Sequence, residues 1–184
     1  MPKLEMKIDK QANIAIFWQQ TSNFPGDEGK ITDYALATGY ARYKGLSSPV
    51  LTVSRQQFFC ILAHGTRTHA SHLNDQESLG LFKNAHAAYG KNRPILLLSC
   101  LTGMQLARRL APMVHADVVA PTGLATIDPD GTVRCGVPDV APSDVGTLNW
   151  MRVATNGAVT MSGTDSLHPS FLSPGYIPRI DIKR

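Results

Sequence analysis

An apolar run in the middle of the chain constrains the fold more than any other feature. The run Ile95–Ser99 follows Pro94, and Cys100 comes directly after it, just before the pair Thr102-Gly103. A short apolar run bounded by turn residues is typical of a strand buried on both faces of a parallel sheet. We therefore expect Cys100 at the carboxyl end of a central strand, where open α/β sheets place their active sites.

A second apolar run, Phe58–Ala63, ends in a similar way at the pair His64-Gly65. Neighbouring parallel strands end at the same edge of a sheet, so we expect His64 to lie near Cys100. Cysteine and histidine are the residue types of a thiol nucleophile and its general base. The sequence therefore predicts a cysteine–histidine hydrolase site.

Strand and helix patterns alternate over the first two thirds of the chain. Further strands are predicted at Ile14–Trp18, Val50–Val53 and Ala116–Ala120. A first helix is predicted at 33–44, capped by Thr32 or Asp33, and a second at about 74–89, with a capping box at Asn74 and Glu77. A third is predicted at 103–110, and Pro112 should disturb or end it. This alternation favours a parallel sheet with right-handed crossovers and helices on both faces.

The pattern changes after Ala120. The stretch Asp128-Pro129-Asp130-Gly131 is a strong turn signal, and it predicts an antiparallel hairpin between Ala125–Ile127 and Thr132–Cys135. The tail from Thr164 to Arg184 is rich in Pro, Ser and Gly, which predicts irregular structure. No linker divides the chain, so residues 1–184 are expected to form a single domain.

Composition narrows the classes of partner and compartment. Hydrophobic residues make up 43% of the 184 residues, and the net charge of +4 is not gathered into a basic block. We therefore predict no nucleic-acid partner and, without a long apolar segment, no membrane partner. The three cysteines have no framework spacing, and the amino terminus lacks an apolar leader. These features predict a protein that is cytoplasmic as synthesised; export as an effector without a signal peptide stays open.

The chemistry of the predicted site depends on the thiolate of Cys100. A helix beginning just after Cys100 and an imidazolium from His64 would both lower the pKa of the thiol. His64 would then act as base and later protonate the leaving group. Gly65 allows a substrate to approach the backbone closely, and the N–H groups of Gly65 and Cys100 are the candidate oxyanion donors.

The apolar strand ending in His64-Gly65, the following helix and the strand ending in Ser99-Cys100 resemble the caspase-like cysteine peptidases of clan CD. The match looks closest to the bacterial branch that includes the self-processing domains of large toxins, and it also resembles cysteine-containing modules of polymorphic toxins and secreted effectors. The resemblance covers about Phe58 to Gly136. It implies a caspase-like α/β sandwich and, by analogy of position, substrate contacts at Thr122 and Gly123.

The same resemblance bears on partners and activators. It implies a protein or peptide substrate, and an immunity or inhibitor protein is a further candidate partner. Toxin relatives activated by inositol phosphates use basic residues near the carboxyl end; Arg179, Lys183 and Arg184 permit this activator without supporting it. No other cofactor is predicted. The separation between His64 and Cys100 is short for the family, so the element between them must be compact.

Other interpretations stay open at this point. The same dyad could run deamidation or acyl transfer, and the domain could instead be an inert binding or adaptor module of caspase-like fold. Cys60 and Cys135 are expected to be structural, because cysteine is often buried without a chemical role. His69 and His72 form a histidine-rich loop with His64, but their spacing fits no compact zinc motif, and no metal site is predicted.

Overall fold

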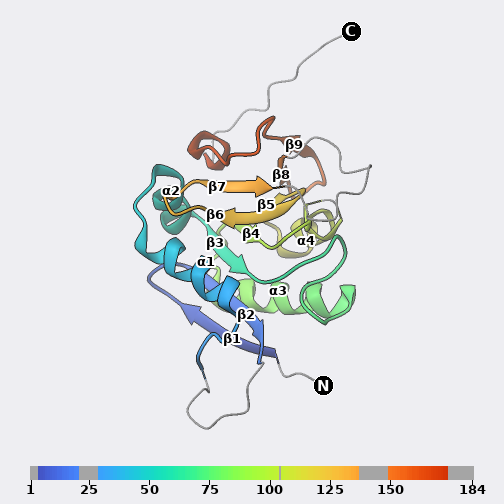
Figure 1. Cartoon of the computed structure of the whole chain (residues 1–184). Helices are drawn as coiled ribbons and strands as arrows, with labels where there is room; N and C mark the ends of the chain where they lie inside the picture. Colours follow the sequence, from blue (N-terminus) through green and yellow to red (C-terminus); the bar gives the residue numbers. More distant parts are fainter. Residues whose placement is uncertain (1–3, 21–28, 104, 137–148, 174–184) are drawn as a thin grey trace.

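A computed structural model describes residues 4–20, 29–103, 105–136 and 149–173 of the chain (Figure 1). Its centre is a seven-stranded sheet with the order β1-β2-β3-β4-β5-β8-β9. The strands are β1 (Leu4–Asp9), β2 (Ile14–Gln19), β3 (Phe59–Leu62), β4 (Ile95–Leu98), β5 (Val118–Pro121), β8 (Trp150–Val153) and β9 (Val159–Met161). The mixed α/β architecture predicted from the sequence is confirmed.

Parallel pairing joins β2, β3, β4 and β5, so the mostly parallel sheet is also confirmed. Strands β1, β8 and β9 are antiparallel, and β8 and β9 form the carboxyl-terminal antiparallel extension. Strand β1 was not predicted. It forms a hairpin with β2 whose turn is held by Asp9, since the Oδ1 of Asp9 accepts from the N–H groups of Gln11 and Ala12.

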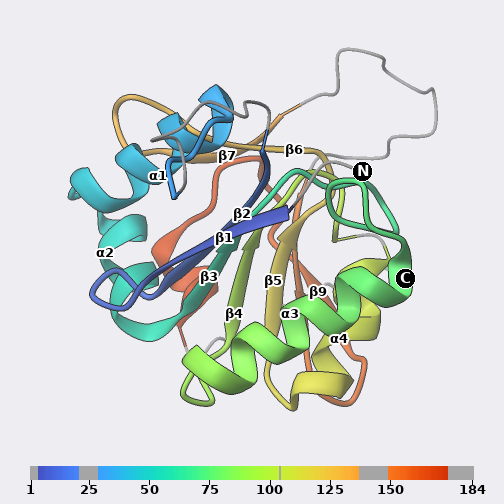
Figure 2. The same ribbon diagram turned by 90° about the horizontal axis from the view of Figure 1, so that it is seen from below.

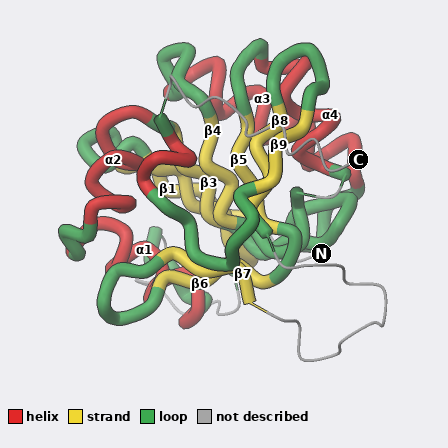
Figure 3. The backbone as a smooth tube through the Cα atoms, turned by 90° about the horizontal axis from the view of Figure 1, so that it is seen from above, coloured by secondary structure: helices red, strands yellow, loops and turns green. Residues whose placement is uncertain are grey.

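Helices cover both faces of the sheet (Figure 2). Helices α3 (Asp75–Tyr89) and α4 (Leu106–Val114) pack on one face, while α1 (Tyr34–Gly45) and α2 (Pro49–Gln57) pack on the other. The predicted hairpin is present as β6 (Leu124–Ile127) and β7 (Val133–Gly136). It forms a separate two-stranded sheet, which Figure 3 shows beside α1 and apart from the main sheet. A short 3-10 helix, η1 (Pro169–Leu172), follows in the tail.

The alternation of side chains along each strand divides the core in two. In β4, Leu96 and Leu98 point toward the α1 and α2 face, whereas Ile95 and Leu97 point toward the α3 and α4 face. All four are at most 2% exposed. A strand buried on both faces is therefore apolar at every position, which is why the run Ile95–Leu98 was recognisable in the sequence.

The connections between the parallel strands do not share one hand. The steps from β2 to β3, β3 to β4 and β4 to β5 all move in the same direction along the sheet. The first passes through α1 and α2 on one face, and the other two pass through α3 and α4 on the opposite face. Connections that step the same way over opposite faces have opposite hands, so the prediction of right-handed crossovers throughout is wrong.

The prediction of a strand at Val50–Val53 is wrong, because these residues lie in α2. The β-branched side chains of Val50 and Val53 suggested a strand, but Ser48 caps a helix and Pro49 occupies its first turn. The helix buries Val50 and Leu51 against the sheet. Tertiary packing together with the cap thus outweighs the β propensity of the segment.

Helices α1 and α3 begin where their caps predicted. The Oδ1 of Asp33 accepts a hydrogen bond from the N–H of Leu36 at 3.1 Å, and Asn74 and Glu77 form a complete capping box. Helix α4 differs from its prediction, because it starts at Leu106 instead of residue 103 and continues through Pro112 to Val114. No helix in the described part of the chain is long and apolar enough to cross a membrane.

Candidate functional site

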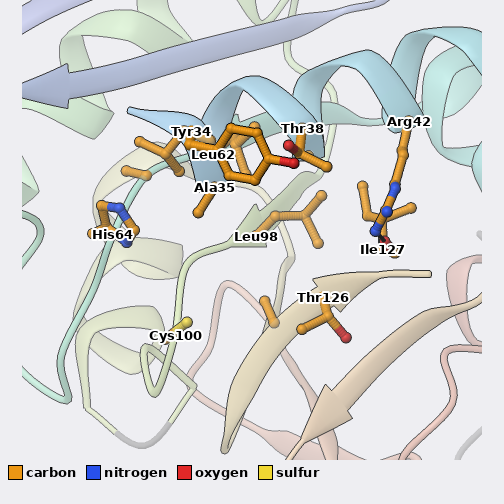
Figure 4. A pocket seen from close by; sticks show the side chains of 14 residues that line it. Tyr34, Ala35, Thr38, Arg42, Leu62, His64, Leu98, Cys100, Thr126 and Ile127 are labelled. Carbon is orange, nitrogen blue, oxygen red and sulfur yellow. Dashed lines mark hydrogen bonds between the residues drawn. The ribbon is translucent and has the colours of Figure 1, made fainter. Parts of the chain in front are cut away.

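A cavity of about 410 Å³ lies on the α1 face of the sheet, between α1 and β6 (Figure 4). Helix α1 forms one wall and β6 the opposite wall, and the carboxyl ends of β3 and β4 close it on the sheet side. Its lining includes both residues of the predicted dyad, His64 and Cys100. The rest is mostly apolar, with Leu62 and Leu98 from the sheet and Ala125 and Ile127 from β6.

The register of the sheet explains why His64 and Cys100 share the cavity. Strands β3 and β4 are neighbours, and Leu62 pairs with Leu98. Each functional side chain comes two residues after its member of this pair, so both emerge at the same edge of the sheet. Among the hydrogen bonds of the described residues, none joins His64 to Cys100, and Figure 4 shows the two side chains standing apart.

Gly65 brings the two strand ends close together. A Cβ atom at Gly65 would lie 2.2 Å from the Oγ of Ser99, 2.8 Å from the carbonyl oxygen of Cys100 and 2.9 Å from the Cγ2 of Thr102. Real Cβ contacts are never that short, so a side chain at Gly65 would push the histidine segment away from the cysteine segment. The glycine is therefore a condition for the juxtaposition of His64 and Cys100.

A third polar residue, Asp33, belongs to this site. The Nε2 of His64 lies 2.7 Å from the Oδ2 of Asp33, and their side chains are 53% and 24% exposed. The other carboxylate oxygen of Asp33 caps α1 by accepting from the N–H of Leu36. The same carboxylate therefore caps the amino terminus of α1 and holds the imidazole of His64. This leaves the Nδ1 of His64 for other partners. The sequence identified Asp33 only as a cap, because no spacing rule links position 33 to position 64.

The pKa of the Cys100 thiol is raised above its ordinary value, chiefly because the side chain is removed from water. A hydrogen bond from the backbone N–H of Ala125 and one from the N–H of Cys100 itself lower this pKa, and nearby Cys135 raises it. The sequence predicted a lowered pKa. That prediction is wrong for this conformation, because desolvation exceeds the effect of the two N–H groups. Cys100 is a neutral thiol at neutral pH.

The predicted contribution of a helix amino terminus is also absent. Helix α4 begins six positions after Cys100, and its first N–H groups are used elsewhere: Leu106 donates to the carbonyl of Arg67 and Ala107 to that of Thr102. Leu101, directly after Cys100, has a positive φ of 64°. A leucine in the left-handed region is strained, which is common at functional sites.

The backbone N–H groups predicted as oxyanion donors are those of Gly65 and Cys100. Neither donates to another residue in the part of the chain that the structure describes. By contrast, the N–H groups that follow Cys100 are occupied: Leu101 donates to the carbonyl of Gly123 and Gly103 to that of Pro121, both at distances below 3.0 Å. The N–H of Gly65 is thus open to an oxyanion, and that of Cys100 contacts only its own sulfur and would have to leave it to bind one.

Thr122 and Gly123, predicted as substrate contacts, do not line the cavity. The hydroxyl of Thr122 is buried and bonds the backbone of Asn149, and the N–H of Gly123 donates to the Sγ of Cys135 at 3.0 Å. Both residues hold the β5–β6 connection in place. The wall of the cavity is formed one step further along the chain, by Ala125, Thr126 and Ile127 of β6.

Strand β6 presents an unpaired edge to this cavity. In the β6–β7 ladder, Asp128 bonds Thr132 across the turn, so the even-numbered residues of β6 face β7 and the odd-numbered ones face away from it. Accordingly, the N–H of Ala125 bonds the sulfur of Cys100, and the carbonyl of Ile127 accepts from Arg42. The edge of β6 therefore runs from Cys100 at one end to Arg42 at the other.

The remaining residues of interest lie outside the cavity. Cys60 and Cys135 are fully buried, and burial raises the pKa of the Cys60 thiol. His69 bonds Thr66 and Thr68 within its loop. No cluster of three or more potential metal ligands occurs among the described residues. The basic residues Arg179, Lys183 and Arg184 lie outside the described residues.

A family model described as a domain of unknown function (DUF8616) matches residues 47–135, just under half of the chain. The matched region contains His64, Gly65 and Cys100 and extends from α2 to β7, whereas Asp33 and α1 precede it. Neither a comparison with curated proteins nor one with solved structures finds a significant match to this chain. The comparisons therefore assign no chemistry to this site.

Proposed function

We propose that this protein is a cysteine endopeptidase in which Cys100 is the nucleophile and His64 the general base. One observation carries the proposal: both side chains line one cavity at the carboxyl ends of adjacent parallel strands, and the close approach at Gly65 keeps them there. Asp33 is the orienting residue, because its carboxylate accepts from the Nε2 of His64 and leaves the Nδ1 as the acceptor of a proton.

The reaction follows the usual course of a thiol hydrolase. The sulfur of Cys100 attacks the substrate carbonyl while its proton passes to the Nδ1 of His64, and the N–H groups of Gly65 and Cys100 stabilise the oxyanion. Collapse of the intermediate transfers that proton to the leaving amine and forms a thioester. A water molecule, deprotonated by His64, then attacks the thioester and releases the acid and the thiol.

We take the neutral thiol of Cys100, and the absence of a hydrogen bond between His64 and Cys100 among the described residues, as the resting state of the site. Attack requires the imidazole to move toward Cys100, and the half-exposed position of His64 leaves room for this motion. Substrate in the cavity would bring the reacting groups together, since catalytic hydrogen bonds often tighten only in the complex. The protein would therefore be weakly reactive until substrate or a partner fills the site.

A peptide is the substrate class that best fits the cavity. The C=O of Ala125 and the N–H of Ile127 point away from β7 and are not the groups that contact Cys100 and Arg42, so an extended peptide can pair with them while its side chains enter the apolar part of the cavity. The caspase-like resemblance of the motifs agrees with this assignment and suggests a bacterial toxin or secreted effector module. In that context the substrate is a protein, and an immunity protein would cover the cavity.

The proposal is tested by incubating the protein with a library of peptides from a digested proteome and identifying new termini by mass spectrometry. The wild type should generate them, and Cys100→Ala and His64→Ala should not. His115→Asn is the matched control, since His115 is an exposed residue with a positive φ at the end of α4, away from the cavity. It should leave cleavage unchanged.

Competitive alkylation across pH provides the second arm of the test. If His64→Ala alters the rate at which Cys100 reacts while His115→Asn does not, the two residues act as a dyad. Conversion of glutamine to glutamate without new termini would replace peptidase by deamidase. Absence of both reactions, with Cys100 alkylation independent of His64, would overturn the proposal in favour of an inert binding module.

A further inference from the structure

The cavity contains one positive charge whose role is not explained by the dyad. Arg42 lies on α1 at the end of the cavity opposite to His64 and Cys100 (Figure 4). Its Nη1 donates to the carbonyl of Ile127 at 2.8 Å, which turns the guanidinium toward β6. A guanidinium has five N–H donors, and this contact uses one of them.

No carboxylate of the described residues forms an ion pair with Arg42. Two acids beside residues that neighbour Arg42 already have partners. Asp128, next to Ile127, pairs with Arg134 at 3.0 Å, and Asp9 pairs with Lys44 and accepts a hydrogen bond from Tyr40. A partly buried guanidinium that has no counter-charge among the described residues, in a mostly apolar cavity, favours an anionic ligand group, and a planar carboxylate matches its geometry.

Strand β6 sets the distance between the two ends of the site. The N–H of Ala125 contacts the sulfur of Cys100, and the carbonyl of Ile127 contacts Arg42. Two to three residue steps of a strand, at about 3.3 Å each, place the guanidinium roughly 7–10 Å from the nucleophile. The lining between them, Leu62 and Leu98, is apolar. The cavity thus has a reactive end, an apolar middle and a cationic end.

The geometry assigns Arg42 as a specificity-determining residue that selects substrates carrying a carboxylate about two to three residues from the bond that is cleaved. An acidic side chain at that spacing would replace water around the guanidinium and accept hydrogen bonds from its unused donors. The inference rests on the proposed function, since it takes Cys100 as the reacting atom. It adds the chemical class of the substrate: an extended peptide with an acidic residue separated from the reacting carbonyl by apolar contacts.

The inference is tested with two alkylating probes of equal length, iodoacetamido-hexanoic acid and iodoacetamido-hexanamide. In each, the sulfur of Cys100 displaces iodide, a carbon–sulfur bond forms, and the thiol proton is taken up by His64 or solvent. The chain from the reacting carbon to the terminal group is roughly 10 Å long when extended, which suits the span to Arg42. In the wild type the acid should alkylate Cys100 about tenfold faster than the amide at low probe concentration.

Three variants separate the role of Arg42 from general effects of charge. Arg42→Gln should abolish the preference for the acid. Arg42→Lys keeps the positive charge and should retain most of the preference, so it separates the effect of the charge from that of losing the contact with Ile127. Lys44→Gln removes the same charge from the same helix, but Lys44 pairs with Asp9, away from the cavity. It should leave the preference unchanged.

The outcomes for the two proposals are distinguishable. If the acid and the amide react equally in the wild type, or if Lys44→Gln reduces the preference as much as Arg42→Gln, the assignment of Arg42 is overturned. Failure of the dyad would appear differently: His64→Ala would leave both rates unchanged while the ratio between the probes persisted. His64→Ala should instead slow both probes and leave their ratio intact.

Discussion

The two faces of the central sheet are built by different means. On one face, α3 and α4 pack against the sheet and against each other, and buried residues such as Phe82 and Leu110 fill the layer. On the other face, the layer combines the helices α1 and α2 with the hairpin β6–β7, and the main cavity opens between α1 and β6. Both faces have large buried clusters, yet this cavity occurs where a helix and a strand edge meet over the sheet.

The difference places the closely packed helix pair on one face of the sheet and the candidate site on the other. Two helices on one face interdigitate their side chains and exclude water. A helix facing a hairpin leaves backbone groups of the strand edge exposed in the gap, and these groups are suited to binding an extended ligand. The candidate site lies in that gap, with Cys100 and His64 at one end.

The largest expected effect comes from a pair of neighbouring residues in β4. Leu97 is buried under α3 and α4, and Leu98 borders the cavity. Leu97→Ala should lower the free energy of unfolding by about 3–5 kcal/mol, because it leaves a void in a filled layer. Leu98→Ala should cost only about 2 kcal/mol, since one side of Leu98 borders the cavity and has fewer packing partners to lose. Urea denaturation measures both; equal costs would contradict the contrast between the faces.

A smaller effect is expected at the strand ends. Gly65→Ala should destabilise the protein by about 1–3 kcal/mol and slow peptide cleavage, because a Cβ would collide with Ser99 and the backbone of Cys100. Gly80→Ala in α3 is the matched control, since a Cβ there meets no atom within 4 Å. It should stabilise the helix by about 0.5–1 kcal/mol. If Gly65→Ala changed neither thermal unfolding nor cleavage, the close approach at Gly65 would not be what holds the two strand ends together.

Asp33 allows its two roles to be separated. Asp33→Asn keeps an oxygen to cap α1 but removes the charge beside His64, so the cleavage rate should fall about tenfold with stability changed by only a few tenths of a kcal/mol. Asp33→Ala should lose a further 1 kcal/mol or so of unfolding free energy, because the cap is gone. Cleavage assays and thermal unfolding measure the two effects. Wild-type cleavage by Asp33→Asn would show that the carboxylate serves the helix alone.

The smallest effect concerns the pH dependence contributed by Cys100. Its thiol has a higher pKa in the folded protein than in the unfolded chain, so the unfolded chain loses its proton first as the pH rises. The stability that this group contributes is present at neutral pH and declines above about pH 9. Unfolding free energies of the wild type should therefore fall more steeply between about pH 8 and 10 than those of Cys100→Ala. Parallel curves would indicate an unperturbed thiol.

The juxtaposition of His64 and Cys100 was predictable from the sequence because it depends on burial and strand direction. Apolar runs ending in His64-Gly65 and Ser99-Cys100 indicated two central strands, and parallel pairing brings their ends together. Asp33 and Arg42 were not assigned to the site. They belong to α1 and its amino-terminal cap, which precede both strands, and only the packing of α1 over the sheet brings Asp33 to His64 and Arg42 to the cavity.

The local signals determined where α1, α3 and the β6–β7 hairpin form, because caps, capping boxes and turn residues act within a few positions. The tertiary structure decided what local signals do not encode: that Val50–Val53 is helical, that the connections have opposite hands and that burial raises the pKa of Cys100. These properties depend on contacts between residues far apart in the chain, and the free energy of such contacts exceeds local propensity.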